Sequence, residues 1–485
     1  MKDRAMRSVV LGWMPVLFLL FASCAMNPVS GGPELMLLSE RDEDRLGAQT
    51  DLQVRSRYGV YEDRELLAYI NDLGRKLGGI SHRSGLDYRF EILDAAAVNA
   101  FAVPGGYVYL TRGILAALNN EAELAGVIGH EIGHIAARHS AQQYSRAQLA
   151  QLTLGIGMIF SETFQALAGL SQLGVQMLFL SFSRDNERQA DALGVEYASK
   201  AGYDAGELAG FFETLQRMNP GSDRSGLPGW FSTHPSPEDR EAAVRAMAKQ
   251  WQRQLGLRDP KANREAYLRK IDGLVYGDDP RQGYVEGGVF YHPDLRFQFP
   301  VPAKWTLTNA ASFVQMVSEA KDAAILLTME SGKTPREAAS SFASKSGGRL
   351  LASNAVTVNG LSAQRLVSEV SGRQGTLRVL SYFIGKGDGV YVFHGFCASA
   401  IFPRYDGVFQ TTMSSFKEVS DRGKISVQPD RIRIRSTKAT GTLESVLRSM
   451  GVAKDDMEKT ALLNAMVLED PVKANSLLKV VERGR

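Results

Sequence analysis

The chain has 485 residues, of which 44% are hydrophobic and 22% are charged. This composition is that of a globular protein and excludes an extended disordered chain. The length predicts about three domains, each large enough to bury a core of its own. The formal net charge is only +3 and no nucleic-acid-binding motif occurs, so we expect no nucleic-acid partner.

The first residues predict export. A net-basic start at 1–7 precedes an apolar run at 9–21, which is too short to anchor stably across a bilayer, so residues 1–23 are predicted to be a secretory signal peptide. The run ends in Phe21, Ala22, Ser23 and Cys24, which resembles the lipobox of bacterial lipoproteins. We expect lipidation at Cys24 and a location on the periplasmic side of the cell envelope, as an outer-membrane lipoprotein. A plain signal peptide is the alternative.

Residues 24–45 are predicted to form the anchor and a turn-rich tether. With Cys24 acylated, Cys397 would be left without a disulfide partner. Residues 39–79 alternate charged and apolar positions at helical spacing, which predicts one or two helices. Residues 88–93 and 107–110 are predicted strands. We expect Tyr107, Val108 and Tyr109 to form an exposed strand that pairs with an extended peptide substrate, with an ordinary small sheet as the alternative.

An HExxH sequence at 130–134 lies in an apolar run of helical period. On a helix, His130 and His134 are one turn apart and project from one face, so both imidazoles can reach one zinc ion. Glu131 can address a metal-bound water instead of the metal. Asn120 is a predicted N-cap, with Glu123 three residues on. The alternative is two histidines that lie four residues apart by chance.

The stretch 149–182 is strongly apolar but interrupted by polar residues. We predict a helical hairpin that covers the active site or touches the membrane surface, and a transmembrane span is the alternative. A further helix is predicted from Ser183 to before Gly202, with Glu187 and Asp191 four apart on one face. Glu187 can bind a metal while Asp191 accepts the distal N–H of a ligand imidazole. A solvated helix face is the alternative.

The rest of the chain is predicted to bind or dock. Charged helical residues at 237–274 lead to a linker at 277–283, and a sandwich-like α+β domain follows at 285–420 with strands near 295–299, 324–327, 379–384 and 389–393 and one helix near 335–346. His292 and His394 are isolated, which predicts structural roles. Residues 421–485 resemble a degenerate LysM module, which either binds glycan strands of peptidoglycan or forms a structural cap.

Several motifs occur in one order: 27–28, 99–106, the HExxH sequence, Ser183 to Gly194 and 232–236. Together they resemble the gluzincin family of zinc metalloproteases that includes HtpX, the CAAX prenyl endopeptidase and BepA. The resemblance implies one Zn2+ per chain, held by His130, His134 and Glu187. It implies that Glu131 is the general base and that Asp191 is an acidic residue of the catalytic site that supports a ligand histidine. It also implies that His234 is a regulatory fourth ligand.

The predicted protein is therefore α+β. It has a signal peptide at 1–23, a tether at 24–45, a mainly helical zincin-type peptidase domain with a small sheet at 46–250, a helical linker at 251–284, the docking domain at 285–420 and the LysM-like module at 421–485. The resemblance implies a zinc endopeptidase of the bacterial envelope that acts in protein quality control. The alternative is a chaperone or assembly scaffold with a latent, His234-inhibited site. The expected partners are unfolded or misassembled envelope proteins, the membrane through the lipid anchor, and peptidoglycan or the outer-membrane assembly machinery.

Overall fold

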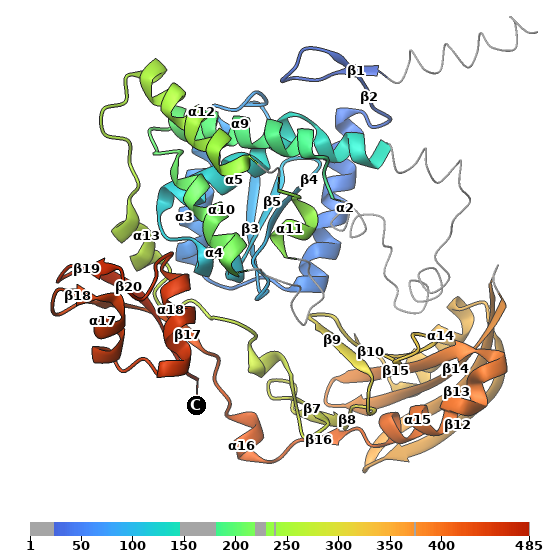
Figure 1. The fold of residues 1–485 in the computed structure, drawn as a ribbon. Coiled ribbons are helices and arrows are strands. Elements are labelled where there is room, and N and C mark those ends of the chain that lie inside the picture. The colour runs from blue at the N-terminus through green and yellow to red at the C-terminus, as the bar shows by residue number, and fades with distance from the viewer. Residues whose placement is uncertain (1–23, 146–180, 219–228, 237–238, 373–374, 485) are drawn as a thin grey trace, which may run out of the picture.

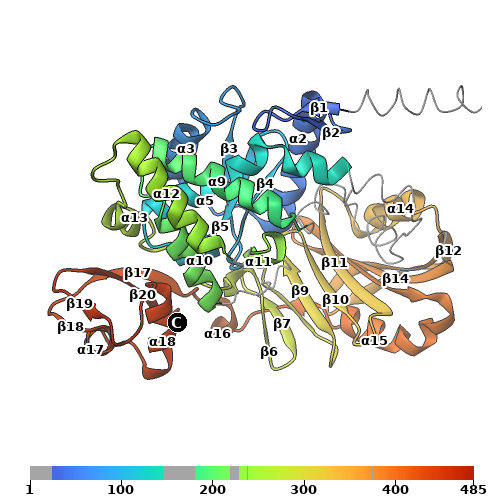
Figure 2. The same cartoon turned by 45° about the horizontal axis from the view of Figure 1, so that its top comes forward.

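The structure is a computed structural model that describes residues 24–145, 181–218, 229–236, 239–372 and 375–484. The chain is an α+β protein, with a mainly helical first region, a sheet-rich second region and a small C-terminal region beside the first (Figures 1 and 2). Among the helices that are described, none has the length and hydropathy needed to cross a bilayer. The predicted signal peptide and nearly all of the predicted apolar hairpin lie outside the described residues.

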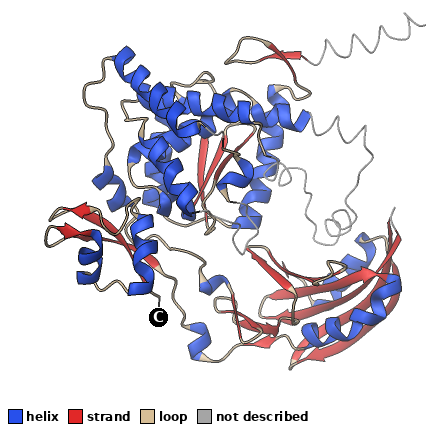
Figure 3. Ribbon diagram, viewed as in Figure 1, coloured by secondary structure: helices blue, strands red, loops and turns tan. Residues whose placement is uncertain are grey.

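The first region is built on a small sheet with helices on both faces (Figure 3). Its strands lie in the order β3-β5-β4, with β5 parallel to β3 and antiparallel to β4. Successive strand residues point to opposite faces, so Val108 and Leu110 pack with α3 and α5 while Tyr107 and Tyr109 pack with α2. The elements are α2 (Glu40–Tyr58), α3 (Arg64–Gly78), β3 (Arg89–Leu93), β4 (Ala100–Val103), β5 (Tyr107–Thr111), α4 (Arg112–Ala117) and α5 (Glu121–Ala136).

The sheet order corrects one prediction. Tyr107, Val108 and Tyr109 lie on β5, which is the middle strand and is paired along both edges. Its backbone groups are used within the sheet, and its residues are buried. These three residues therefore cannot form the exposed strand that pairs with a peptide. In the described sheet the edge beside α5 belongs to β4 instead.

The remaining helices of the first region pack around α5. Helix α9 begins directly after Ser183, where the sequence predicted a helix to start, and the Ser183 side chain caps it by accepting a hydrogen bond from the Asn186 backbone N–H. Helix α9 packs along α5, and α12 packs on both α9 and α10. The helices are α9 (Arg184–Lys200), α10 (Glu207–Met218), α11 (Trp230–Thr233), α12 (Arg240–Leu255) and α13 (Arg264–Lys270).

The second region is an antiparallel sheet of seven strands in the order β12-β13-β14-β15-β11-β10-β9. Helix α14 packs on one face, and α15 and a four-stranded sheet, β16-β8-β7-β6, pack on the other. The predicted strand runs and the helix near 335–346 are present. The elements are β6 (Tyr284–Glu286), β7 (Val289–His292), β8 (Phe297–Pro300), β9 (Thr306–Ala310), β10 (Phe313–Val317), β11 (Ala323–Ser331), α14 (Pro335–Lys345), β12 (Arg349–Val358), β13 (Leu361–Gly372), β14 (Gly375–Lys386), β15 (Gly389–Ala398), α15 (Phe402–Ser414) and β16 (Lys417–Glu418).

The C-terminal region pairs its first and last long strands around two short helices. Strand β17 (Arg431–Ser436) is antiparallel to β20 (Leu477–Glu482), and α17 (Leu443–Ser449), α18 (Met457–Leu463) and the short strands β18 (Gly441–Thr442) and β19 (Pro471–Val472) lie between them in sequence. Ile432 exchanges backbone hydrogen bonds of 2.8 Å with Gly273 and Leu274, just after α13. Because Ile432 and Leu463 belong to the core around α5, this region is packed onto the first one.

Candidate metal centre

Four buried side chains meet beside the middle of α5. His130 and His134 come from α5, Glu187 from α9, and His234 directly follows α11. Each offers one ligand atom, and these atoms all lie within 4.8 Å of one another. The four side chains, called the metal cluster below, are at most 1% exposed. Residues that the sequence spreads over more than 100 positions are thus brought to one point.

Glycines allow the two ligand-bearing helices to approach closely. A Cβ atom added at Gly129 would lie 3.0 Å from the Gly194 carbonyl oxygen, and one added at Gly133 would lie 3.1 Å from the Ala190 carbonyl oxygen. From the other side, a Cβ at Gly194 would lie 2.9 Å from the backbone nitrogen of His130. Larger residues would therefore separate α5 from α9, and with them the histidines from Glu187.

The spacing of the donor atoms suits a small tetrahedral ion. His130 Nε2 lies 3.0 Å from His134 Nε2 and 3.3 Å from His234 Nδ1. Glu187 oxygens lie 3.6 Å from His130 Nε2, 3.4 Å from His134 Nε2 and 3.1 Å from His234 Nδ1. Ligands that bind Zn2+ tetrahedrally at about 2.0–2.1 Å are separated from one another by about 3.4 Å. Nitrogen and carboxylate oxygen donors are also the set that zinc accepts.

The outer nitrogens of the two α5 histidines are both engaged. His130 Nδ1 lies 2.9 Å from Asp191 Oδ1, as the sequence predicted. His134 Nδ1 lies 3.0 Å from His139 Nδ1, and His139 Nε2 lies 2.9 Å from Gln189 Oε1. If each Nδ1 carries the proton and donates it outward, both Nε2 lone pairs face the centre of the cluster. His139 thus orients His134.

Arg240 was not anticipated from the sequence. Its guanidinium is buried at the start of α12, where Nη2 donates to Asp191 Oδ1 at 2.8 Å and lies 3.4 Å from Glu187 Oε2. The guanidinium also lies over the Phe212 ring at 3.8 Å. A usable signal existed, because Arg240 shares the buried face of α12 with Val244 and Ala248, at intervals of four residues. A positive charge on a buried helix face indicates an acidic partner.

Two aromatic rings enclose the cluster. Trp230 stacks on His234 with ring centroids 4.3 Å apart, and Phe182 stacks on His134 at 4.0 Å. Trp230 is fully buried, and its backbone N–H donates to the Val98 carbonyl oxygen. This contact ties α11, and so His234, to the segment that leads into β4. The apolar walls keep the donor atoms away from bulk water.

The buried charges of the cluster shift one another's pKa values. Burial raises the pKa of Glu131, and burial lowers that of His134 well below its usual range. Burial alone would raise the pKa of Glu187, but His234, His134 and His130 outweigh it and hold that pKa well below normal. For His234, burial is outweighed by the carboxylates of Glu187 and Glu131, which raise its pKa. The cluster therefore contains an ionised carboxylate, whose negative charge a bound cation would neutralise.

Several polar atoms at this point lack hydrogen-bonding partners among the described residues. They are both carboxylate oxygens of Glu131, Oε2 of Glu187 and Nε2 of His234. Glu187 Oε2 lies 3.4 Å from Arg240 Nη2, and Glu131 Oε1 lies 3.7 Å from His234 Nε2, so both pairs are too long for a hydrogen bond of ordinary length. Buried polar atoms without partners are rare, because each carries a desolvation penalty. Glu187 Oε2 fits a bound divalent ion, and the Glu131 carboxylate fits a water beside that ion.

The other predicted residues lie elsewhere. His394 is buried in the second region, where its Nδ1 lies 2.7 Å from Ser381 Oγ. His292 Nδ1 accepts from the Leu295 backbone N–H. Both histidines are therefore held by local contacts, as expected. Cys397 is a buried free thiol. Cys24 begins the short strand β1 (Cys24–Met26), which pairs with β2 (Pro33–Leu35), and its predicted lipidation stays a prediction.

Comparison with known proteins agrees with this geometry. Residues 62–248 match the model of peptidase family M48. A beta-barrel assembly-enhancing protease of Escherichia coli K12 is 32% identical over 223 residues, which cover 44% of this chain and 45% of that protein. A Vibrio cholerae protein described as a putative beta-barrel assembly-enhancing protease is 31% identical over 206 residues, which cover 41% of this chain and 42% of that protein. The human mitochondrial metalloendopeptidase OMA1 is 24% identical over 242 residues, covering 45% of each chain.

The match spans less than half the length of each of these relatives. It contains α5 and α9 and ends in α12, so all four members of the metal cluster, Glu131 and Asp191 lie inside it. The order of motifs, the spacing of the donor atoms and the family match agree with one another. Residues 62–248 of this chain are a peptidase domain of family M48.

Proposed function

We propose that the protein is a zinc endopeptidase whose active site is the metal cluster together with Glu131. One observation carries the proposal: the buried Glu131 carboxylate, which has no hydrogen-bonding partner within the described part of the chain, lies beside donor atoms at the spacing that tetrahedral zinc requires. Zinc bound there would polarise a peptide carbonyl and lower the pKa of a water toward neutrality. His130, His134 and Glu187 would hold the ion.

The chain's own residues supply the rest of the chemistry. Glu131 would take a proton from the attacking water and pass it to the leaving amine. Its raised pKa, caused by burial, suits a group that must both accept and release a proton. Asp191 would fix the tautomer of His130, with Arg240 holding Asp191 in place. Strand β4 is the edge strand beside α5, and although its side chains are buried, an extended substrate would pair with its backbone.

His234 would keep the site latent. With His130, His134 and Glu187, it completes four protein donors, and a tetrahedral zinc ion with four protein ligands has no open position. His234 would have to withdraw before a water and a substrate could bind. The same arrangement favours the second candidate function, a chaperone or assembly scaffold whose peptidase site stays closed. The alternative role for His234 is to stabilise the oxyanion during turnover.

The substrates and location are proposed from the relatives and the amino terminus. Two relatives carry the name beta-barrel assembly-enhancing protease, which supports unfolded or misassembled envelope proteins as substrates and the outer-membrane assembly machinery as a partner. The signal-like residues 1–23 and Cys24 support a lipid-anchored protein on the periplasmic side. The pairing of β17 with β20 around two helices is compatible with the LysM-like prediction, and peptidoglycan stays a proposed ligand.

The proposal is tested by measuring zinc content and cleavage of an unfolded fluorescent protein. We expect wild type to bind zinc, Glu131→Gln to bind zinc without cleaving, and His234→Ala to cleave faster than wild type. Lower activity in His234→Ala would instead indicate that His234 takes part in catalysis. Full cleavage by Glu131→Gln would refute the assignment. If no variant cleaves while Glu131→Gln still suppresses aggregation of the unfolded protein, the scaffold function is favoured.

A further inference from the structure

A lysine from the C-terminal region reaches into the first region. Lys479 lies on β20 and is fully buried, and its Nζ donates to the carbonyl oxygens of Ala116 at 2.8 Å, Ala117 at 3.3 Å and Leu118 at 2.9 Å. These carbonyls end α4, where backbone acceptors have no partner inside the helix. A protonated amine has three N–H donors. The Nζ atom is thus within hydrogen-bonding distance of three acceptors on this one helix end.

The carbonyls that Lys479 binds lie directly before the active-site helix. Only residues 118–120 separate α4 from α5, and Asn120 caps α5 by accepting from the Glu123 backbone N–H at 2.8 Å. The Glu123 carboxylate accepts in turn from the Asn119 backbone N–H at 2.6 Å. His130 follows on the same helix, roughly 13 Å along its axis from the first residue. A shift of this turn would therefore be carried to the metal ligands.

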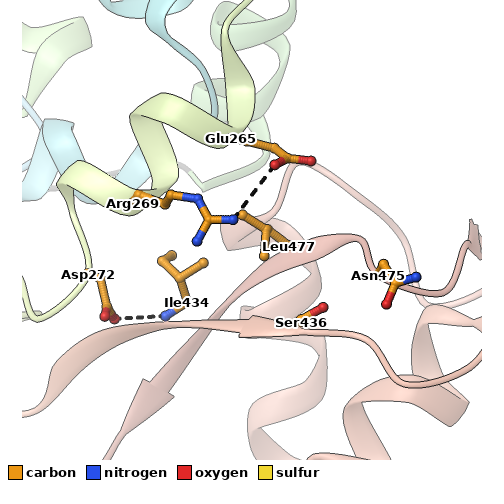
Figure 4. Close-up of a pocket in the computed structure, with 7 residues that line it drawn as sticks. All are labelled: Glu265, Arg269, Asp272, Ile434, Ser436, Asn475 and Leu477. Carbon is orange, nitrogen blue, oxygen red and sulfur yellow. Dashed lines mark hydrogen bonds and ion pairs between the residues drawn. The ribbon is translucent and has the colours of Figure 1, made fainter.

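Helix α13 and the segment just before it also contact this turn. Arg264 Nη1 donates to the Asn119 carbonyl oxygen at 3.0 Å, and the Ala122 backbone N–H donates to the Ala262 carbonyl oxygen at 3.2 Å. Helix α13 is itself joined to the C-terminal region, because Asp272 accepts from the Ile434 backbone N–H at 3.0 Å. This junction borders a cleft of about 590 Å³. Figure 4 shows the side chains that line the cleft, with Asp272 bonded to Ile434. The C-terminal region and α13 form one support for the start of α5.

Charge makes the contact specific to a lysine. Burial lowers the pKa of Lys479 well below its usual range, and the charge of Glu123 opposes that shift. Burial raises the pKa of Glu123, and the hydrogen bond from the Asn119 backbone and the charge of Lys479 oppose that shift. The three carbonyl acceptors and the carboxylate charge therefore offset part of the cost of burying the amine. An apolar residue of the same length would leave the three carbonyls without a donor.

We infer that Lys479 is a positioning residue of the peptidase: through it, the C-terminal region sets the place of α5 and so of His130 and His134. This inference rests on the proposed function. It makes the C-terminal region part of the catalytic architecture, in addition to any ligand that the region binds. Loss of the lysine should then disturb catalysis in a folded protein and leave substrate binding as it was.

The test uses the full chain with Lys479→Met and a matched control, Lys473→Met, an exposed lysine of the same region. Hydrogen exchange of the amides at 119–126 is measured without zinc, and kcat and KM are measured with zinc. We expect Lys479→Met to exchange these amides about tenfold faster and to lose about tenfold in kcat with unchanged KM. Lys473→Met should match wild type. Lys479→Gln, whose amide has only two donors, should be intermediate.

Wild-type exchange and kcat in Lys479→Met would overturn the inference. It would also be overturned if both Lys479 variants failed to fold while Lys473→Met folded, because the lysine would then serve the fold alone. A wild-type protein without peptidase activity would defeat the proposed function. The exchange experiment would still decide whether Lys479 holds the helix, since it requires neither zinc nor cleavage.

Discussion

Asp191 offers the sharpest test of how the metal cluster is held. Its Oδ1 accepts from His130 Nδ1 at 2.9 Å and from Arg240 Nη2 at 2.8 Å, and the carboxylate is almost fully buried. Asp191→Asn keeps the shape of the side chain and removes its charge. Loss of such a partner of a ligand histidine typically weakens metal binding about 10- to 100-fold, which is about 1.4–2.7 kcal/mol.

The same substitution weakens the ion pair of Arg240. Removing one partner of a buried pair destabilises a protein by about 3–5 kcal/mol, and Glu187 at 3.4 Å keeps part of the compensation. We therefore expect a loss near the lower end, about 3 kcal/mol in the free energy of unfolding. Zinc affinity is measured by chelator competition and stability by urea unfolding, with Asp185→Asn as the control because Asp185 is exposed on the same helix. Unchanged zinc affinity in Asp191→Asn would refute this account of the site.

Three further predictions concern helix packing, pH and the metal. Gly194→Ala should destabilise the protein by about 1–3 kcal/mol and weaken zinc binding, because the new methyl group would contact the His130 backbone. Gly210→Ala is the control, since a methyl group there enters open space and should cause neither loss. Urea unfolding measures the stability of each variant, and chelator competition measures its zinc affinity. Burial lowers the pKa of His394 to about 3 from its usual 6.5, so the unfolded chain binds the proton more readily. The folded state should lose stability as the pH falls below 6.5, by about 2 kcal/mol at pH 5, and His394→Gln should flatten that slope in urea unfolding. Chelation of zinc held at 100 times its Kd should remove about 2.7 kcal/mol, measured as a lower Tm, and a Tm unaffected by chelator would contradict a bound ion.

Local signals explain what could be predicted. Helix α5 starts at Asn120 and helix α9 at Ser183, and in each case the capping side chain lies only three residues from the amide that it caps. The sequence alone is therefore sufficient to predict where these helices begin. The one-turn spacing of His130 and His134 is likewise local. Glu187 is distant in sequence, and it was predicted because its carboxylate and that of Asp191 share one helix face within a motif of known order.

Contacts between distant segments explain what could not be predicted. Whether β5 is an edge or a middle strand depends on which strands flank it, and Tyr107 to Tyr109 have the same residue pattern in either case. Arg240 lay in a segment that read simply as charged and helical, since the burial of its guanidinium arises only when α12 packs on α9. Lys479 was part of a module motif, and nothing in that motif shows that the module packs against α4.

The contact of Lys479 with α4 also has a consequence in time. This lysine follows Ala116 by 363 residues, and at about 5–20 residues per second a ribosome needs roughly 20–70 s to add that length. For most of this interval the HExxH helix is already made and Lys479 is not. We expect nascent and truncated chains that lack Lys479 to be poor proteases for this reason.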